Sequence, residues 1–282
     1  MKAILQNSIA GIVLFCALAG ISVQAADYKQ PVRQPDGPDA VPLLLPAAAN
    51  GALLEAPVAP PRMAPELALA TYQNRAERQL TDLGAYSDTT IIEAELPSTR
   101  QKGQFELQRT FLAPRSMAFK ALRFVGDGFI KNNVIVRWLQ SEVDRARKGV
   151  GAATALTDQN YHFAFKGYGQ IGQRQVYVFQ VKPRHKAAGL FKGRVFLDPY
   201  TGRIRRAEGR LVKSPSVFLK KIEFVQDYAD FGDFTLPVHV HSEVSTRIVG
   251  RAIVDIQHTD YQAKSFSEIH SSDGGGGAGG AN

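Results

Sequence analysis

The stretch FTLPVHVHSEVSTR, residues 234–247, decides the fold class of this chain. In it, Leu236, Val238 and Val240 alternate with polar residues. A period of two residues places apolar side chains on one face of a β-strand and polar side chains on the other. The stretch therefore predicts a strand with one face in the protein core and the other in water.

Segments with the same strand character recur through most of the chain. Residues 104–111 alternate in the same way, with Phe105, Leu107 and Phe111 on the apolar face. Short connections such as residues 198–202, Asp-Pro-Tyr-Thr-Gly, are typical of turns, so consecutive strands should pair antiparallel. The further ranges with strand character are 88–96, 116–125, 160–167, 174–182, 191–198, 203–213, 217–228 and 250–261.

Two segments have helical character instead. Residues 66–80 have helical spacing of apolar residues and contain neither Gly nor Pro. In residues 129–148, Ile130, Val134 and Trp138 recur every four residues, which predicts an amphipathic helix. A strand at residues 134–138 is the alternative, because the β-branched run there favours extended backbone.

The order of these elements is helix, three strands, helix and seven strands, which predicts a mainly β (α+β) domain. A sheet of about ten strands must curl, and two amphipathic helices are available to cover one of its faces. We therefore expect a large curled antiparallel sheet or an incomplete β-barrel, with one or two helices covering its concave face.

Residues 1–26 have the features of a secretory signal peptide. Lys2 precedes an apolar run over residues 9–23, and residues 23–25, Val-Gln-Ala, form a small-x-small cleavage pattern. An uncleaved membrane anchor is the alternative, but the run is shorter than the roughly 20 residues that a spanning helix needs. We therefore expect cleavage of this segment and a periplasmic or secreted location.

The flanking segments narrow the folded part to residues 66–270. Residues 27–65 form a Pro/Ala-rich stretch, in which we expect a semi-rigid linker, and residues 271–282 form a Gly-rich tail, which we expect to be disordered. The single cysteine, Cys16, lies in the expected signal peptide and follows Phe15, where lipid attachment would need a small residue. We therefore expect neither a lipid anchor at Cys16 nor a disulfide in the mature chain.

The charge of the chain is concentrated in one segment. The 282 residues carry a formal net charge of +8, and residues 182–221 contain twelve Lys and Arg against two acidic residues, a local charge of +10. An anionic membrane surface or an acidic surface of an envelope protein would suit this segment, and a solvated strand face is the alternative. We expect no nucleic-acid binding, because the chain should be exported and the segment lacks a recognition helix.

Nine residues of this basic segment are candidates for contact with an anionic surface. They are Lys182, Arg184, Lys186, Lys192, Arg194, Arg203, Arg205, Arg206 and Arg210.

The sequence contains no recognisable catalytic motif. It has no phosphate-cradling Gly-rich loop, no Gly-x-Ser-x-Gly elbow and no His-Glu-x-x-His helix, so we predict a binding protein without a cofactor. An exported hydrolase is the remaining alternative. His239, His241 and Glu243 share one strand face, where we expect solvated side chains rather than a metal site. We also expect Asp227, Asp230 and Asp233 to be solvated carboxylates at a turn.

Arg109 is the most unusual residue of the predicted strands, because it lies on an otherwise apolar face between Leu107 and Phe111. A guanidinium there must find hydrogen-bond acceptors or reach the rim of the sheet with its stem buried. It could thus be a polar latch in an apolar cavity, or simply a rim arginine. The candidate cavity residues are Phe105, Leu107, Arg109, Phe111, Trp138, Tyr161, Phe163, Phe165, Tyr177, Phe179, Phe224, Leu236, Val238 and Val240.

Residues 103–109, Gly-Gln-Phe-Glu-Leu-Gln-Arg, resemble the Gly-x-apolar-x-apolar-x-Arg strand of the outer-membrane lipoprotein carrier (LolA-like) superfamily. The resemblance implies that Arg109 helps to hold a helical lid over an acyl-chain cavity, although Thr110 stands where the family has proline. Residues 66–262 are also similar to an uncharacterised bacterial envelope group labelled lipoprotein-sorting-like. The stretches that carry this second likeness are 160–163, 182–184, 190–195, 208–209, 213–216, 224–228 and 234–237.

The resemblance implies a half-barrel with an apolar interior. We therefore expect a carrier-like protein that binds lipid or lipoprotein acyl chains. An envelope sensor or scaffold, which would use the same fold to bind a protein partner, is the alternative.

Overall fold

The computed structural model describes residues 62–149, 151–213, 219–246 and 250–273. The expected signal peptide with Cys16, most of the expected linker and the end of the expected tail lie outside the described residues. No described helix combines the length and the hydrophobicity that crossing a bilayer requires.

The described residues contain the ten expected strands. The strands are β1 (Leu83–Leu96), β2 (Gln101–Leu112), β3 (Ser116–Gly126), β4 (Tyr161–Ile171), β5 (Arg174–Pro183), β6 (Phe191–Leu197), β7 (Ile204–Leu211), β8 (Leu219–Phe231), β9 (Phe234–Thr246) and β10 (Arg251–Ser265). The structure confirms a strand in every range that the sequence predicts, with the largest differences at the start of β1 and at the ends of β4 and β10.

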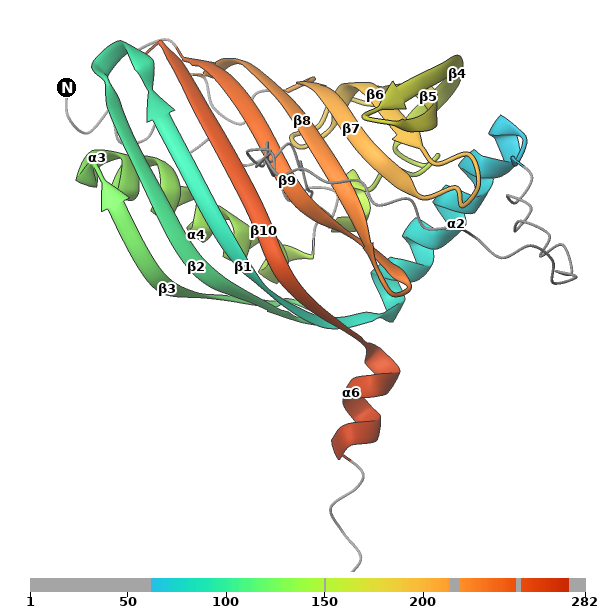
Figure 1. Ribbon diagram of the computed structural model, residues 1–282, viewed down its shortest axis with the longest axis horizontal. Helices are drawn as coiled ribbons and strands as arrows, with labels where there is room; N and C mark the ends of the chain where they lie inside the picture. Colours follow the sequence, from blue (N-terminus) through green and yellow to red (C-terminus); the bar gives the residue numbers. More distant parts are fainter. Residues whose placement is uncertain (1–61, 150, 214–218, 247–249, 274–282) are drawn as a thin grey trace, which may run out of the picture.

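All ten strands form one antiparallel sheet with the order β3-β2-β1-β10-β9-β8-β7-β6-β5-β4. Every neighbour in this order is also a neighbour in sequence, except for β1 and β10, which join the two halves of the chain. The outermost strands β3 and β4 do not pair, so the sheet is curled but open (Figure 1). The prediction of an incomplete barrel is confirmed.

Helices pack against the concave face of the sheet (Figure 1). A continuous helical segment covers the half of the sheet that contains β1, β2, β9 and β10. It consists of α3 (Gly128–Ile130), a π-helical turn η2 (Lys131–Ile135) and α4 (Val136–Lys148). The second half is covered by α2 (Pro65–Asp82), which buries Ala68 and Tyr72. Shorter helical turns are η1 (Pro97–Thr99) and α5 (Gly151–Thr154).

The helical interpretation of residues 129–148 is confirmed, and the alternative strand at 134–138 is wrong. Val134, Ile135, Trp138 and Leu139 form a buried stripe with helical spacing, so helical backbone buries all four against the sheet at once. The helix ends at Gly149, whose φ of +60° is the left-handed conformation that glycine adopts without strain.

A C-terminal helix, α6 (Phe266–Asp273), follows β10 and extends into the segment expected to be a disordered tail. It packs against the start of β1 at Gly84, where a Cβ atom would lie 2.8 Å from the backbone of Phe266. This close approach requires the absence of a side chain at Gly84.

Candidate functional site

Arg109 is fully enclosed on the concave face, at the end of the apolar surface of β2. Only 4% of the residue is exposed, and its Nε lies 2.7 Å from Oδ2 of Asp88, its cross-strand partner on β1. Its Nη2 donates a hydrogen bond of 2.7 Å to the Tyr261 hydroxyl oxygen on β10. The guanidinium is therefore buried with hydrogen-bond partners, and the expectation of a rim arginine is wrong.

Two tyrosine rings pack around the guanidinium. The Arg109 Cζ atom lies 5.0 Å from the ring centroid of Tyr86 and 5.9 Å from that of Tyr261. Phe111 stacks on the outer side of Tyr86 at 5.2 Å between centroids. Cation–π contact of this kind stabilises a cation that has left water.

The Asp88 carboxylate also contacts Thr90 on β1 and His258 on β10, which are cross-strand neighbours. The Thr90 hydroxyl group lies 2.5 Å from Oδ1 of Asp88 and 2.8 Å from Nδ1 of His258, and this Nδ1 lies 3.2 Å from the same Oδ1. Both contacts of the ring are made at Nδ1. A hydrolase triad needs its carboxylate and its nucleophile on opposite ring nitrogens, so these three residues do not form one.

Burial and charge determine the protonation of this cluster. Burial opposes ionisation of Asp88, but the positive charge of Arg109 and hydrogen bonds from His258 and Thr90 hold the pKa of Asp88 well below its usual range. Burial and the charge of Arg109 lower the pKa of His258 to about 4, against the attraction of Asp88. At neutral pH the cluster therefore contains one buried ion pair and a neutral imidazole.

Helix α4 contributes a further buried carboxyl group, that of Glu142, which is 2% exposed. It accepts a hydrogen bond of 2.8 Å from Arg145 one turn later. Burial raises the pKa of Glu142, and the charges of Arg145 and Arg109 partly offset this effect. The positive charge of Arg109 on β2 therefore acts on a carboxyl group of the covering helix.

The predicted cavity residues separate into two groups. Five of them pack with α4 in the first half of the sheet: Phe105, Leu107, Trp138, Val238 and Val240. Five others pack in the second half, beneath α2: Tyr161, Phe163, Tyr177, Phe179 and Phe224. Leu211 packs against both groups, so the two apolar clusters adjoin.

The remaining candidates lie at the margins of these clusters. Leu236 is fully buried on β9, Phe111 stacks on Tyr86, and Phe165 is 38% exposed on β4, where it meets Tyr177 edge-on. The structure thus places α4 and α2 over the surface that the sequence predicts to be a cavity.

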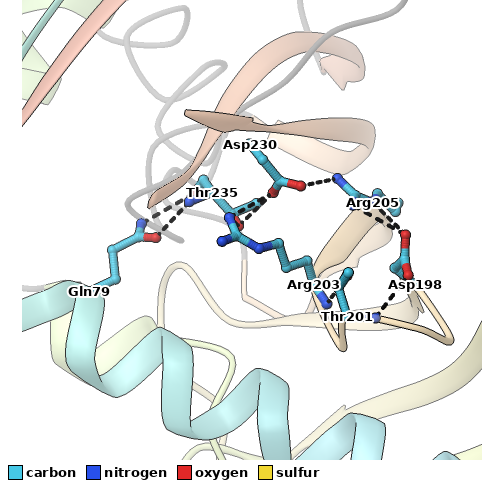
Figure 2. A network of polar contacts seen from close by, with 7 residues as sticks. All are labelled: Gln79, Asp198, Thr201, Arg203, Arg205, Asp230 and Thr235. Atoms are coloured by element: carbon cyan, nitrogen blue, oxygen red, sulfur yellow. Dashed lines mark hydrogen bonds and ion pairs between the residues drawn. The ribbon is translucent and has the colours of Figure 1, made fainter. Parts of the chain in front are cut away.

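The basic candidates are divided by their partners. Figure 2 shows that Arg203 and Arg205 converge on Asp230, at 3.2 Å and 2.7 Å, and that Arg205 also contacts Asp198 at 3.1 Å. The same network reaches α2 through Gln79, whose side chain bonds both backbone groups of Thr235. These arginines therefore stabilise the connection between strands and helix.

Two more arginines of the basic set are paired across strands. Arg194 contacts Glu208, and Arg206 contacts Asp227, which is only 5% exposed. The expectation of solvated turn carboxylates is wrong for Asp227 and Asp230, because both lie within β8 and pair with arginines. Asp233 is exposed in the turn between β8 and β9, as expected. Arg184 donates to the backbone carbonyl oxygen of Asp158, and Lys182 is exposed on β5.

A cluster of two histidines and one aspartate lies on the convex face of the sheet. His239 and His241 both contact Oδ1 of Asp255, at 3.2 Å and 3.0 Å. Within the described ranges, no group of three His, Cys, Asp or Glu side chains is arranged to hold a metal ion.

Sequence reasoning missed most members of the Arg109 cluster, although the signal was available. Asp88 and Thr90 have the same parity as the buried Ile92 on β1, and His258 has the same parity as Ile256 on β10. A polar residue at an apolar-face position is the feature that singled out Arg109, and the same test would have found these three. Glu142 carried the corresponding helical signal, because it continues the four-residue spacing of the apolar residues Ile130, Val134 and Trp138.

Solved structures that are similar to this chain include a LolA superfamily protein from Nitrosomonas europaea, with 8% sequence identity and a TM-score of 0.35. That match covers 71% of this chain and 93% of the other. An outer membrane lipoprotein-sorting protein domain from Vibrio parahaemolyticus has 14% identity and a TM-score of 0.36, covering 70% of this chain and 92% of the other.

A DUF1329 family protein from Desulfovibrio piger has 10% identity and a TM-score of 0.37, again covering 70% of this chain and 92% of the other. The similar structures thus include members of the group that residues 103–109 resemble. No protein-family model matches the chain, and no curated protein matches its sequence. No residue role is carried from these proteins to this chain.

Proposed function

We propose that this protein is an exported, carrier-like binding protein that holds acyl chains of a lipid or lipoprotein on the concave face of its open sheet. The observation that carries the proposal is that an amphipathic helix, α4, covers this apolar face. The edge strands β3 and β4 do not pair, so the sheet around the helix remains open. The resemblance of residues 103–109 to the carrier strand supports the same assignment.

An acyl chain would take the place of apolar contacts that α4 now makes with the sheet. Leu107, Val238 and Val240 are each no more than 2% exposed beneath the helix. Burial of the chain there would contribute about 0.8 kcal/mol per methylene group, which is enough to compete with the contacts of one helix. Binding therefore involves displacement of α4 from part of the concave face.

Two polar features set the limits of this site. The Asp88–Arg109 pair and His258 occupy one end of the apolar surface, and a hydrocarbon cannot replace their hydrogen bonds, so the acyl chain ends before them. The indole N–H of Trp138 is buried and makes no hydrogen bond with the described residues. The ester carbonyl oxygen of a lipid would satisfy this donor.

Trp138 also makes the proposal testable, because it is the single tryptophan of the chain and is 3% exposed within the site. A neutral monoacylglycerol with bromine atoms on its acyl chain should quench the Trp138 fluorescence saturably, since bromine quenches only at contact. Lipid extracted from the protein purified from its own host should also appear in mass spectra at a stoichiometric amount.

The matched control moves the reporter to the surface. In a Trp138→Phe, Tyr168→Trp variant the only indole stands on β4 at a position that is 68% exposed. Saturable quenching of Trp138 but not of this reporter supports binding beneath α4. Equal quenching of both, or no quenching and no co-purified lipid, would overturn the proposal.

A protein-binding scaffold is the second candidate, and the exposed edge strand β3 favours it. Leu122 and Val125 are 50% and 49% exposed there, and edge strands offer unpaired backbone groups to a partner. Capture of one stoichiometric protein that is unaffected by delipidation would favour this candidate over the carrier.

A further inference from the structure

The ion pairs of the basic segment show where its uncompensated charge is located. Arg194, Arg203, Arg205 and Arg206 each pair with a carboxylate. In contrast, Lys186, Lys192, Arg210 and Lys220 form no ion pair with any carboxylate in the part of the chain that the structure describes. Lys182, Arg184 and Lys213 form no ion pair with a described carboxylate either. Lys186, Lys192, Arg210 and Lys220 lie at one end of β6, β7 and β8.

These residues line a single groove of about 560 Å³, together with Lys221. The register explains why a groove exists at this place. Strands β7 and β8 pair from Arg206 opposite Asp227 to Arg210 opposite Glu223, and beyond that pair they are not joined by hydrogen bonds. The residues that line the groove include the ends of β7 and β8 beyond this last pair.

One carboxylate lies beside these cations. Glu223 is opposite Arg210 on β8, and its Oε1 lies 2.6 Å from Nζ of Lys221. This pair neutralises one of the five cations, while no acidic residue is among those that line the groove. Several like charges around one concavity repel each other in the free protein, and a multivalent anion relieves that repulsion.

The groove is not purely polar, because Leu211, Val212 and Ile222 contribute apolar surface to it. Ile222 belongs to the apolar cluster beneath α4, and Leu211 packs against both apolar clusters of the concave face. The charged groove therefore adjoins the apolar clusters of the concave face. A ligand that has a phosphate at one end and a hydrocarbon at the other is complementary to a charged groove beside an apolar surface.

We propose that this groove binds the phosphate of an anionic lipid headgroup, held by Lys186, Lys192, Arg210 and Lys220, with the acyl chains entering past Leu211 and Ile222. The acyl part of the inference rests on the proposed function. The phosphate part stands on the groove itself. The lipid enters at the end of β7 and β8, where strand pairing stops, and its headgroup remains at the rim.

Binding of the full chain to phosphatidylcholine vesicles with and without phosphatidylglycerol tests the proposal. We expect binding that needs phosphatidylglycerol and weakens as salt rises. The variant Lys192→Glu, Arg210→Glu should bind these vesicles at least about tenfold more weakly, since each basic residue near an anionic surface contributes several-fold. A Lys192→Gln, Arg210→Gln variant, which adds no repulsion with Glu223, should show a smaller loss of the same kind.

The matched control is Lys120→Glu, Arg123→Glu on β3, which changes the net charge by the same amount at two exposed positions. β3 is the edge strand farthest from β4 in the sheet order, and β2, β1, β10, β9 and β8 separate it from β7. Equal losses in the groove variant and the control would show that the attraction is diffuse and would overturn the proposal. No loss in the groove variant would overturn it as well.

Two further measurements separate the sources of phosphate and the two proposals. A short-chain phosphatidylglycerol should compete with the vesicles far better than glycerol phosphate, and equal competition would reassign the groove to free phosphate and overturn the lipid assignment. The groove variant should retain quenching of Trp138 by the neutral brominated monoacylglycerol. Loss of vesicle binding with retained quenching supports both proposals, whereas vesicle binding through the groove without any quenching contradicts only the proposed function.

Discussion

Two histidine–aspartate pairs lie on opposite faces of the sheet. His258 of β10 contacts Asp88 of β1 on the concave face, and His241 of β9 contacts Asp255 of β10 on the convex face. The inner residues are 1% and 2% exposed, whereas the outer side chains are 36% and 34% exposed. Burial and the charge of Arg109 lower the pKa of the inner histidine to about 4. The hydrogen bond to Asp255 raises the pKa of the outer one, against a smaller effect of burial.

The same pair of side chains therefore behaves in opposite ways on the two faces. Inside, the carboxylate is engaged by a permanent cation and the imidazole stays neutral, because a second positive charge would be repelled in a dry environment. Outside, water is near and the Asp255 carboxylate favours the protonated form of the imidazole, which raises its pKa. The face that a histidine occupies therefore decides the direction in which its pKa moves.

The largest effect that we expect from this comparison follows Asp88→Ala. The substitution leaves Arg109 buried without its counter-ion, which should lower the free energy of unfolding by about 3–5 kcal/mol. Urea unfolding at neutral pH measures this loss, with Glu93→Ala on the exposed face of the same strand as the control. A double variant, Asp88→Leu with Arg109→Met, should recover much of the stability, and a single-variant loss below that of the control would contradict the assignment.

The pH dependence of stability should separate the two histidines. The pKa of His258 is about 4 in the folded protein and 6.5 ordinarily, so the unfolded chain binds a proton in this window that the folded protein does not. Stability should therefore fall by about 2 kcal/mol from pH 7 to pH 5 through this residue.

The raised pKa of His241 has the opposite sign, since its contribution is present at low pH and is lost as the pH rises through its folded pKa. Urea unfolding at both pH values should give a steeper loss for the wild type than for His258→Gln, whereas His241→Gln should keep the steep loss. Equal slopes for the wild type and His258→Gln would show that His258 is not held neutral.

The smallest effect should follow Arg251→Gln on the convex face. Arg251 contacts Glu243, as Arg109 contacts Asp88, but the two side chains are 56% and 39% exposed. Exposed ion pairs contribute little to stability, so the free energy of unfolding should change by less than about 0.5 kcal/mol. A loss of unfolding free energy close to that of Asp88→Ala would contradict the prediction that the buried ion pair matters more for stability than the exposed one.

The strand and helix pattern could be predicted because periodicity depends on local sequence and on which face meets the core. Leu236, Val238 and Val240 identify their strand whatever it pairs with, and Trp138 identifies its helix by spacing. The helix α6 was missed because it has only eight residues, and its contact with Gly84 comes from the far end of the folded domain. Short helices depend on tertiary packing more than on local preference.

The candidate site was predicted in part. Arg109 was visible as a charge on an apolar face, but its partner Tyr261 and the partner of Asp88, His258, lie on β10, the last strand in the chain, some 150 residues away. The basic segment was visible as a run of charge. Which arginines are neutralised depends on Asp227 and Asp230 of β8, across strand pairs that sequence spacing does not specify.

The sequence by itself determined the alternation that makes the ten strands, the two amphipathic helices and the excess of positive charge over residues 182–221, because these depend on residue type and period. Only the tertiary structure decided that β1 pairs with β10, which closes the cluster of Asp88, Arg109 and His258. It also decided that the pairing of β7 with β8 stops beside a groove, where four cations that form no ion pair with a described carboxylate lie with Leu211 and Ile222. Both follow from contacts between distant segments, whose geometry is set by the curl of the whole sheet.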